Sequence, residues 1–320
     1  MILLSDFVIS GVFMDELDIG RFLSVDKSDL DSCLDVVEHQ ELIGGVVASM
    51  RIHHMRFDGN GRPVVKALAE ALYQYIIEYC ISCKNRPEQL NARQAAKLTK
   101  EARDLFRHPV VTIDNPDMSG EAGEALLFFL SEAILQAPQV VAKMELKTNH
   151  KDEVKGSDGI HMKWNSQDEV VDFYFGESKM YQDVGRAISA ALDSVDGFHE
   201  GEMYKHEFNM VTKHFKYADE DVREAVRDLI KFGEPGPGVR INHACLIGYD
   251  WSEYGADPTA DVKKHVAEFR LRLLADSVRL AKMLNARFSN FEKKHLRFEV
   301  FFIPFPSVQE FRNAFNEALN

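Results

Sequence analysis

A chain of 320 residues, of which 45% are hydrophobic, can bury one large core or two smaller ones and has the composition of a globular protein. Its net charge of −13 argues against non-specific nucleic-acid binding over the whole surface, because phosphate contacts depend on Lys and Arg. Four cysteines are too few for a disulfide framework, no apolar run could span a bilayer, and the first residues lack the basic start of a signal peptide, so we expect a cytoplasmic protein.

Charge is distributed unevenly along the chain. Residues 1–40 contain nine Asp and Glu residues against two Lys and Arg residues, whereas residues 262–299 contain ten Lys and Arg residues against four acidic ones. Such asymmetry is typical of proteins that keep a basic working surface apart from an acidic remainder. The alternative interpretation is a set of ordinary solvated helix faces.

The first part of the chain, residues 1–118, is predicted to be an α+β region without a chemical motif. Residues 43–57 have the composition of a strand, and residues 64–83 and 91–108 have apolar side chains at helical spacing. The turn residues Asn115-Pro116 mark its end. We expect this region to contact a partner, with its acidic N-terminal segment as the candidate surface.

The second part, residues 119–320, alternates helices and strands. Its predicted elements are a helix at 120–135 with Ser119 as N-cap, strands at 140–148, 160–164 and 169–181, a helix at 183–195, a second near 219–232, a strand at 239–251, a basic helix at 260–285, a strand at 295–305 and a helix capped by Ser307. We interpret the order from 120 to 251 as αβββαβ, an α/β core in which helices cover a sheet.

The predicted strand at 169–181 has an unusual end. Residues two apart share a face of a strand, so Val171, Phe173, Phe175, Glu177 and Lys179 point the same way. Charged groups on an apolar face are costly unless they are paired or bound to a metal. A structural ion pair between the glutamate and the lysine is one interpretation, and a functional site is the other.

Further carboxylates are predicted close to this strand end. Asp158 lies 19 residues before Glu177, in the turn or strand that precedes this one, and the flanking Gly156 and Gly159 permit a tight approach. Glu121 and Glu124 lie three residues apart on the predicted helix and therefore share a face. Oxygen ligands of this kind suit a hard cation, so we expect Mg²⁺, with Mn²⁺ as an alternative.

This arrangement resembles the PD-(D/E)xK nuclease superfamily, which has a restriction-endonuclease-like core of order αβββαβ. The resemblance implies that Asp158 is the metal-binding aspartate and that Glu177 and Lys179 form the (D/E)xK pair. It also implies that Glu124 is the helical glutamate of the active site. The metal would lie between the turn, the strand and the helix.

The resemblance also assigns supporting roles. Ser178 would offer its main-chain carbonyl to the metal, and Glu121 would hold a second metal or a metal-bound water if Glu124 does not. One departure is Ser157, which precedes Asp158 where the superfamily motif has proline. That position varies within the superfamily.

Three basic residues are candidate DNA contacts. Lys147 and Lys163 lie on predicted strands, and Arg270 lies on the predicted basic helix. A phosphate contact is one role for each of them, because Lys and Arg neutralise phosphates. The alternative is a solvated strand end for the lysines and, for the helix, a buried apolar stripe with solvated basic residues beside it.

Longer segments resemble the HamA family, the effector subunits of the bacterial Hachiman anti-phage system. The similar segments are residues 119–134, 140–148, 156–161, 172–181 and 302–315. The resemblance implies a DNA nuclease held, as a heterodimer, by a HamB-like superfamily 2 helicase. It further implies degradation of DNA when the helicase meets aberrant or phage DNA.

Cys80 and Cys83 have C-x-x-C spacing, but a structural zinc site wants four ligands and no second such pair exists. We interpret them as packed or free thiols. The overall hypothesis is therefore a Mg²⁺-dependent deoxyribonuclease that hydrolyses phosphodiester bonds. Two alternatives remain open: a non-catalytic module that binds DNA or a helicase, and an RNA-cleaving nuclease that uses the same residues.

Overall fold

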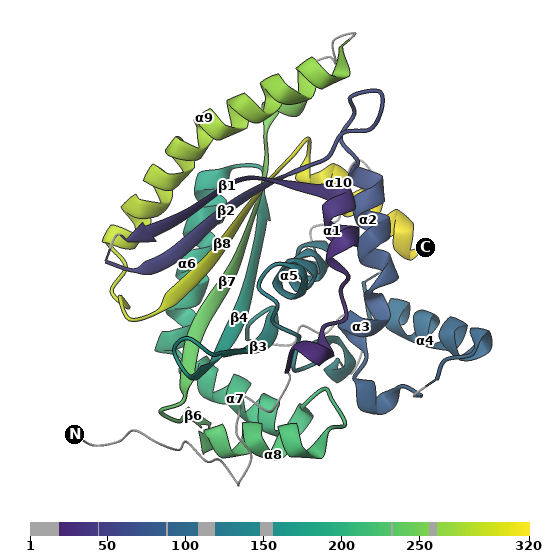
Figure 1. The fold of residues 1–320 in the computed structure, drawn as a ribbon, viewed down its shortest axis with the longest axis vertical. Helices are drawn as coiled ribbons and strands as arrows, with labels where there is room; N and C mark the ends of the chain where they lie inside the picture. Colours follow the sequence, from purple (N-terminus) through teal and green to yellow (C-terminus); the bar gives the residue numbers. More distant parts are fainter. Residues whose placement is uncertain are drawn as a thin grey trace.

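A mixed six-stranded sheet with the order β1-β2-β8-β7-β4-β3 runs through the computed structural model (Figure 1). The structure describes residues 19–43, 45–87, 89–107, 119–147, 156–231, 233–255 and 261–320. The strands are β1 (Leu34–Ile43), β2 (Val47–Met55), β3 (Gly159–Asn165), β4 (Val170–Tyr181), β7 (Val239–Asp250) and β8 (Arg297–Phe305). The four central strands are parallel, and the two outer strands pair antiparallel to their neighbours.

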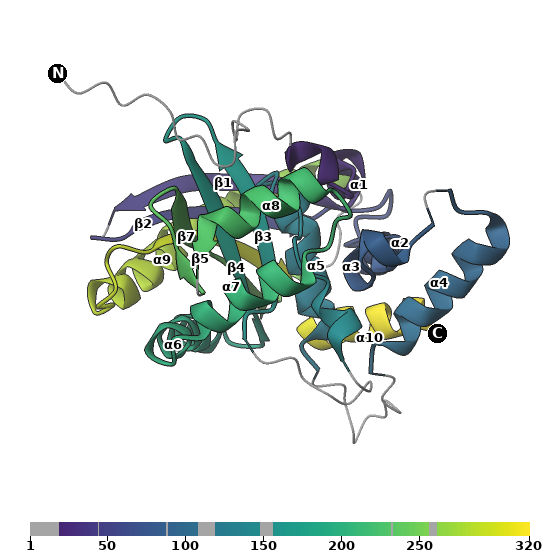
Figure 2. The same cartoon turned by 90° about the horizontal axis from the view of Figure 1, so that it is seen from below.

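Helices cover both faces of this sheet. The helices are α1 (Lys27–Cys33), α2 (Val65–Gln74), α3 (Ile76–Cys80), α4 (Ala92–Asp104), α5 (Glu121–Ala133), α6 (Val184–Glu200), α7 (Met203–His214), α8 (Glu220–Leu229), α9 (Val262–Ser289) and α10 (Val308–Leu319). α5 and α6 both contact β4 and β7, and they lie on opposite sides of β4 (Figure 2). α9 runs along β1 and contacts α6, while α10 packs on α2.

The apolar face of β4 is buried by helices that follow it in the chain. The rings of Phe173 and Phe175 lie 5.3 and 5.4 Å from the ring of Phe208 in α7, and Phe175 also contacts Phe198 of α6. Phe173, Phe175 and Phe208 are fully buried. The apolar half of the strand face is therefore ordinary core, and only its last residues, from Glu177 onward, need another explanation.

Most strongly periodic segments form the predicted elements, but the predicted αβββαβ order is not observed. The expected strand at 140–148 is instead a short 3₁₀ helix, η4 (Lys143–Leu146), preceded by a single bridge from Gln139 to His161. Between residues 120 and 251 the order is α5-β3-β4-α6-α7-α8-β7, with a small hairpin, β5 (Ile230–Lys231) and β6 (Glu234–Pro235), before β7. The expectation of three consecutive strands was wrong.

The failed strand has a physical explanation. In a strand, Lys143, Glu145 and Lys147 would share one face, but each finds a partner in a different element: Glu207 of α7, residues 82 and 85 after α3, and Glu121 of α5. The 3₁₀ turn permits these three directions. A second correction concerns α5, whose N-cap is Gly120 and not Ser119.

Several elements in the structure lack a counterpart in the sequence prediction. They include α1, β1 and α7, and the last of these occupies the His- and Lys-containing stretch between the predicted helices. The sequence also predicts a short extended run and loop at 109–120 and a polar turn at 149–159. Residues 109–118 of the first and 149–155 of the second lie outside the described residues.

The N-terminal region, residues 1–118, and the second part, residues 119–320, do not form separate sheets. β2 pairs in parallel with β8 from Val47 opposite Arg297 to Ile52 opposite Phe302, so both parts of the chain contribute to one sheet. In the described part of the chain, none of the helices, including the 28-residue α9, is both long and apolar enough to cross a membrane.

Candidate active site

The charged end of β4 lies beside the start of β3. Nζ of Lys179 is 2.5 Å from Oε1 of Glu177, and their side chains are 23% and 13% exposed. The ion pair that one interpretation of the sequence predicts is therefore present. Burial lowers the pKa of Lys179, but attraction from Glu177 and Asp158 outweighs it and leaves this pKa above its ordinary value.

Asp158 immediately precedes β3 and continues the contact of that strand with β4. The pairing of β3 with β4 begins at Gly159 opposite Gly176, and one residue earlier the Asp158 N–H donates to the Gly176 carbonyl at 2.8 Å. The Asp158 carboxylate then accepts the N–H of Ser178 through Oδ2 at 2.6 Å. The aspartate is thus fixed beside Glu177 by the main chain of β4.

Helix α5 brings Glu124 to the same place. A Cβ atom on Gly123 would lie 2.4 Å from Oγ of Ser178 and 2.9 Å from Sδ of Met180, so only glycine permits this approach of α5 to β4. The Tyr79 hydroxyl donates to Oε2 of Glu124 at 3.4 Å. Burial, together with the nearby charge of Glu121, raises the pKa of Glu124 to about 7.

The three carboxylates interact electrostatically. Burial raises the pKa of Asp158 well above its ordinary value, and the negative charges of Glu124 and Glu177 raise it further. The N–H of Ser178 and the charge of Lys179 oppose this effect without cancelling it. Asp158 of the turn is therefore close enough to a helix glutamate and to a strand glutamate for both charges to affect its pKa.

Glu121 has a different orientation from Glu124. Its Oε1 lies 2.8 Å from Nζ of Lys147, and its Oε2 accepts the Arg107 N–H at 2.8 Å. The side chains of Glu121 and Lys147 are only 8% and 7% exposed. The two residues that the sequence suggests as a metal ligand and a DNA contact are thus partners of each other.

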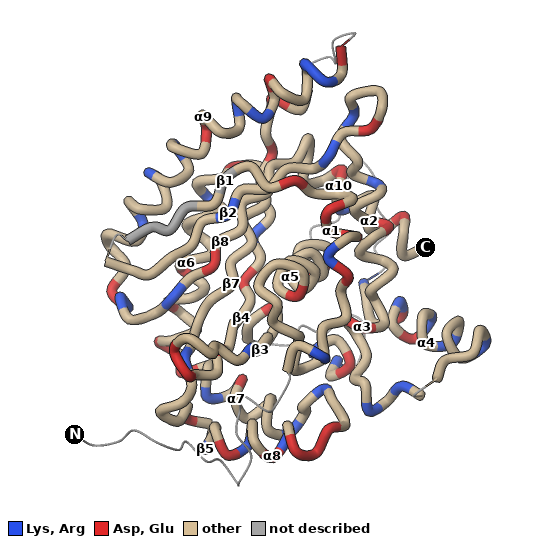
Figure 3. The backbone as a smooth tube through the Cα atoms, viewed as in Figure 1, with Lys and Arg blue, Asp and Glu red and all other residues tan. Residues whose placement is uncertain are grey.

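The other two candidate DNA contacts also have partners within the chain. Nζ of Lys163 donates to the Leu135 carbonyl at 3.1 Å. Arg270 on α9 donates to the Val36 carbonyl at 3.2 Å, but its side chain remains 47% exposed. Figure 3 shows further Lys and Arg residues along α9, so the predicted basic helix is present.

The donor set suits a hard cation. Mg²⁺ is usually bound through one or two carboxylates with several waters retained, and Asp158 and Glu177 with the Ser178 carbonyl offer such oxygens. The described residues contain no group of three or more His, Cys, Asp or Glu side chains already arranged around a metal position. A Mg²⁺ site with two carboxylate ligands and several waters does not require three such side chains. A bound cation would also offset the repulsion of the Asp158 carboxylate by Glu124 and Glu177.

Three site residues, Lys143, Glu207 and Tyr79, have no counterpart in the sequence prediction. Lys143 and Glu207 form a buried ion pair beside the residue before Asp158, with 2.6 Å between Nζ and Oε1. The sequence gives little indication of a contact between Lys143 and Glu207. Lys143 lies in a predicted strand with alternating polar residues, and Glu207 lies in a stretch where no helix is predicted. Tyr79 is also part of the site, but its sequence context is that of a core residue.

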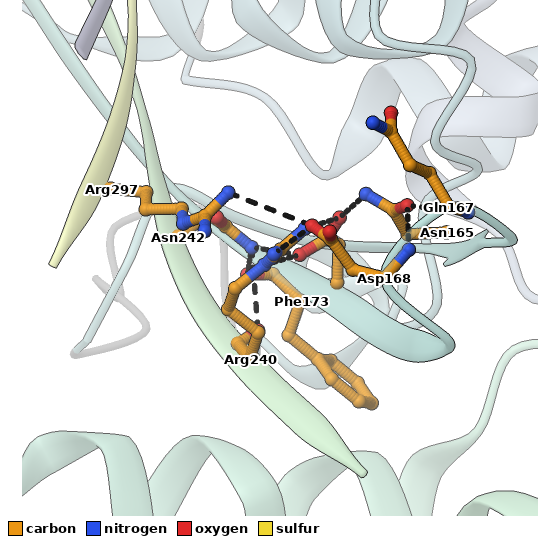
Figure 4. A network of polar contacts seen from close by, with 8 residues as sticks. Asn165, Gln167, Asp168, Phe173, Arg240, Asn242 and Arg297 are labelled. Carbon is orange, nitrogen blue, oxygen red and sulfur yellow. Dashed lines mark hydrogen bonds and ion pairs between the residues drawn. The ribbon is translucent and has the colours of Figure 1, made fainter. Parts of the chain in front are cut away.

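The opposite end of β4 carries a second polar network, shown in Figure 4. Asp172 is 1% exposed and accepts hydrogen bonds from Arg240 at 2.5 and 2.8 Å, from Asn242 at 2.8 Å and from Asn165 at 3.0 Å. Arg240 also pairs with Asp168. This network joins β3, β4 and β7, and Arg297 of β8, 3.8 Å from Asp168, supplies the second positive charge for its two aspartates.

The cysteines agree with the sequence interpretation. All four are free, and Cys80 is fully buried, which raises the pKa of its thiol well above the ordinary value. Cys83 is half-buried, and its Sγ lies 2.9 Å from a guanidinium nitrogen of Arg86.

Comparison with known proteins gives one family. The family model described as HamA matches residues 30–319, which is nearly the whole chain. A search of curated proteins gave no match. The match includes α5, the turn at 156–158 and β4, the three segments that build the carboxylate site. The chain therefore belongs to the HamA family, which is associated with Hachiman antiviral defence.

Proposed function

We propose that the chain is a metal-dependent DNA nuclease that hydrolyses phosphodiester bonds and acts as the effector of a defence complex. The observation that supports it is the convergence of Asp158, Glu177, Glu124 and Lys179 from three separate segments at one end of the sheet. Groups with strongly perturbed pKa values that cluster in this way are typical of functional sites. A controlling helicase is implied by the family resemblance alone.

The roles of the residues follow from their chemistry. Asp158, Glu177 and the Ser178 carbonyl would hold Mg²⁺, which supplies charge neutralisation at the phosphate and an activated water. The ammonium group of Lys179 is held beside this position by Glu177 and can stabilise negative charge that develops on the phosphate oxygens. Glu124 can accept a proton from the attacking water near neutral pH, because its pKa is about 7.

The test is cleavage of plasmid DNA by the purified protein, alone and with a HamB-like helicase, with Mg²⁺ or EDTA and with or without ATP. Glu177→Gln is the site variant, and Glu299→Gln is its matched control. Glu299 is 19% exposed, lies on the same sheet and pairs with Arg51 at 2.9 Å, much as Glu177 pairs with Lys179. We expect Mg²⁺-dependent cleavage that Glu177→Gln abolishes and Glu299→Gln retains.

Other outcomes would replace the proposal with one of the alternatives. Cleavage of an RNA substrate in place of DNA would identify a ribonuclease that uses the same residues. Absence of cleavage under every condition, with DNA or helicase binding intact, would identify a non-catalytic module. In that case the pair of Glu177 and Lys179 would be structural only.

A further inference from the structure

The turn that carries Asp158 is held by a buried ion pair from two other elements. Lys143 lies in η4 and Glu207 lies in α7, and 2.6 Å separates Nζ from Oε1. Lys143, Glu207 and Ser157 are 7, 0 and 4% exposed, so water has little access to this contact. The proposed roles of the metal-site residues do not include this pair.

Both members of the pair bind the main chain of Ser157. Oε1 of Glu207 accepts the Ser157 N–H at 2.8 Å, and Nζ of Lys143 donates to the Ser157 carbonyl at 2.6 Å. The Ser157 hydroxyl donates to the Gly159 carbonyl at 3.0 Å. The peptide groups on both sides of Ser157 are therefore fixed immediately before Asp158.

Gly156 shows how closely the ion pair fits this turn. Its φ of +113° lies in a region that only glycine adopts without strain. A Cβ atom there would lie 1.8 Å from Oε1 of Glu207 and 3.2 Å from Nζ of Lys143. The turn and the ion pair are packed against each other with no space for a side chain between them.

Stability is a weak explanation for this ion pair. The loss of hydration of two buried charges often offsets their attraction, and well-packed apolar residues of similar volume are frequently as good or better. Oε2 of Glu207 is also buried without a hydrogen-bond partner among the described residues. What the pair does provide is a fixed position for two successive peptide groups.

We infer that Lys143 and Glu207 are positioning residues, which hold the Asp158 carboxylate in register with Glu124 and Glu177. The inference rests on the proposed function, because a fixed position matters chiefly if the carboxylate binds a metal. Residues that orient metal ligands from behind typically contribute about 10- to 100-fold to metal affinity or activity.

The test uses the variant Lys143→Met/Glu207→Leu, which removes both charges together and leaves neither one buried alone. We expect about 10- to 100-fold weaker Mn²⁺ binding by isothermal titration calorimetry and a similar fall in DNA cleavage. We also expect faster hydrogen exchange at the Ser178 amide, which the Asp158 carboxylate holds. The matched control is Arg51→Met/Glu299→Leu, which removes an ion pair between β2 and β8. It should leave Mn²⁺ binding, DNA cleavage and exchange at Ser178 unchanged.

A folded double variant with wild-type Mn²⁺ affinity and wild-type exchange at Ser178 would overturn the inference. If the double variant does not fold, Lys143→Met/Glu207→Gln replaces it, because it keeps an acceptor for the Ser157 N–H and leaves no charge buried alone. That variant should bind Mn²⁺ several-fold more weakly, and unchanged binding and exchange would again overturn the inference.

The hydrogen-exchange measurement separates this inference from the proposed function. If the wild-type protein neither binds Mn²⁺ nor cleaves DNA, the proposed function fails. Exchange at Ser178 then still decides whether the ion pair holds Asp158. Faster exchange in the double variant supports the positioning role, and unchanged exchange rejects it.

Discussion

At the scale of single residues, the charged groups at the end of β4 are in an unfavourable position without a ligand. The ion pair of Glu177 and Lys179 is half-buried, and the gain from such pairs is small once lost hydration is counted. Asp158 adds a carboxylate whose charge is opposed by burial and by both neighbouring glutamates. A divalent cation bound here would attract the carboxylates and offset both their burial and their mutual repulsion. We therefore assign the cluster to metal binding.

The roles of Lys179 and Glu177 can be separated. Lys179→Met should reduce DNA cleavage by about 100-fold or more, because a charge that stabilises the transition state is lost. It should leave Mn²⁺ binding intact, since Lys179 is not a ligand. Cleavage assays and calorimetry on the same preparation check both expectations, with Arg51→Met as the control that retains cleavage. Loss of Mn²⁺ binding in Lys179→Met would contradict this division.

The sequence identified part of this site and missed the rest for physical reasons. Glu177 and Lys179 could be predicted because they interrupt an apolar strand face, and Glu124 because it lies on a predicted helix. Lys143 and Glu207 could not, because their role depends on a contact 64 residues apart in the chain. The sequence also could not show that Glu121 turns away from the site toward Lys147.

At the scale of elements, the close approach of α5 to β4 brings Glu124 to the site. Gly123→Ala should force α5 away from Ser178 and Met180, lower the free energy of unfolding by about 1–3 kcal/mol and reduce cleavage. Gly197→Ala is the control, because no atom lies within 4 Å of a Cβ at Gly197 on α6. Denaturant unfolding and cleavage assays measure both, and equal behaviour of the two variants would refute this role for Gly123.

β4 is anchored at its other end by Asp172, whose pKa lies below the ordinary value of 3.8. Burial alone would raise this pKa, but hydrogen bonds from Arg240, Asn165 and Asn242 outweigh burial. A lowered pKa in the folded state stabilises the protein above pH 3.8, and this contribution is lost as the pH falls through the lower value. The network therefore holds the strands together at neutral pH and weakens in acid.

Arg240→Met tests this anchor. It should lower the free energy of unfolding at pH 7 by about 3 kcal/mol. This is the lower end of the usual range of destabilisation for breaking a buried ion pair, and we choose it because the Arg240 side chain is partly exposed. The difference from wild type should be smaller at pH 3, which lies below the ordinary pKa of 3.8, than at pH 7, because the stabilisation from the lowered pKa of Asp172 is progressively lost there. Urea unfolding at the two pH values measures it. A deficit that is the same at both would show that the charge of Asp172 is not involved.

Prediction at this scale succeeded where the local pattern was strong. α5, β4 and β8 are rich in apolar residues that are buried in the structure, and Ser307 caps α10 as expected. The segment at 140–148 alternates like a strand, yet its charged residues are drawn to three separate elements and it forms a 3₁₀ turn. Tertiary contacts overrode the local pattern there.

At the scale of the whole molecule, the sheet is completed by segments from both ends of the chain. β2 pairs with β8, which lies about 250 residues later, and such a parallel pairing leaves no local signal in the sequence. The acidic N-terminal segment is also partly engaged in the fold. Asp26 caps α1, Asp29 accepts the Tyr75 hydroxyl and Asp31 pairs with Lys27.

The hypothesis that this segment binds the helicase can be tested without disturbing the described fold. Deletion of residues 1–18 removes four acidic residues and none of the described elements. If the segment is the partner surface, the truncated chain should no longer retain the helicase in a pull-down. Thermal unfolding of the truncated chain provides the control for folding. Full retention by a folded chain would show that residues 1–18 are not needed for helicase binding.

The central claim is that Asp158, in the turn at 156–158, and Glu177 of β4 together bind one divalent cation. Calorimetric titration of the wild-type protein with Mn²⁺ tests it most directly, with Asp158→Asn and Glu177→Gln measured in parallel. We predict one binding site per chain in the wild type and its loss in each variant, although the two residues are 19 apart in sequence. Unchanged Mn²⁺ binding in both folded variants would contradict the account.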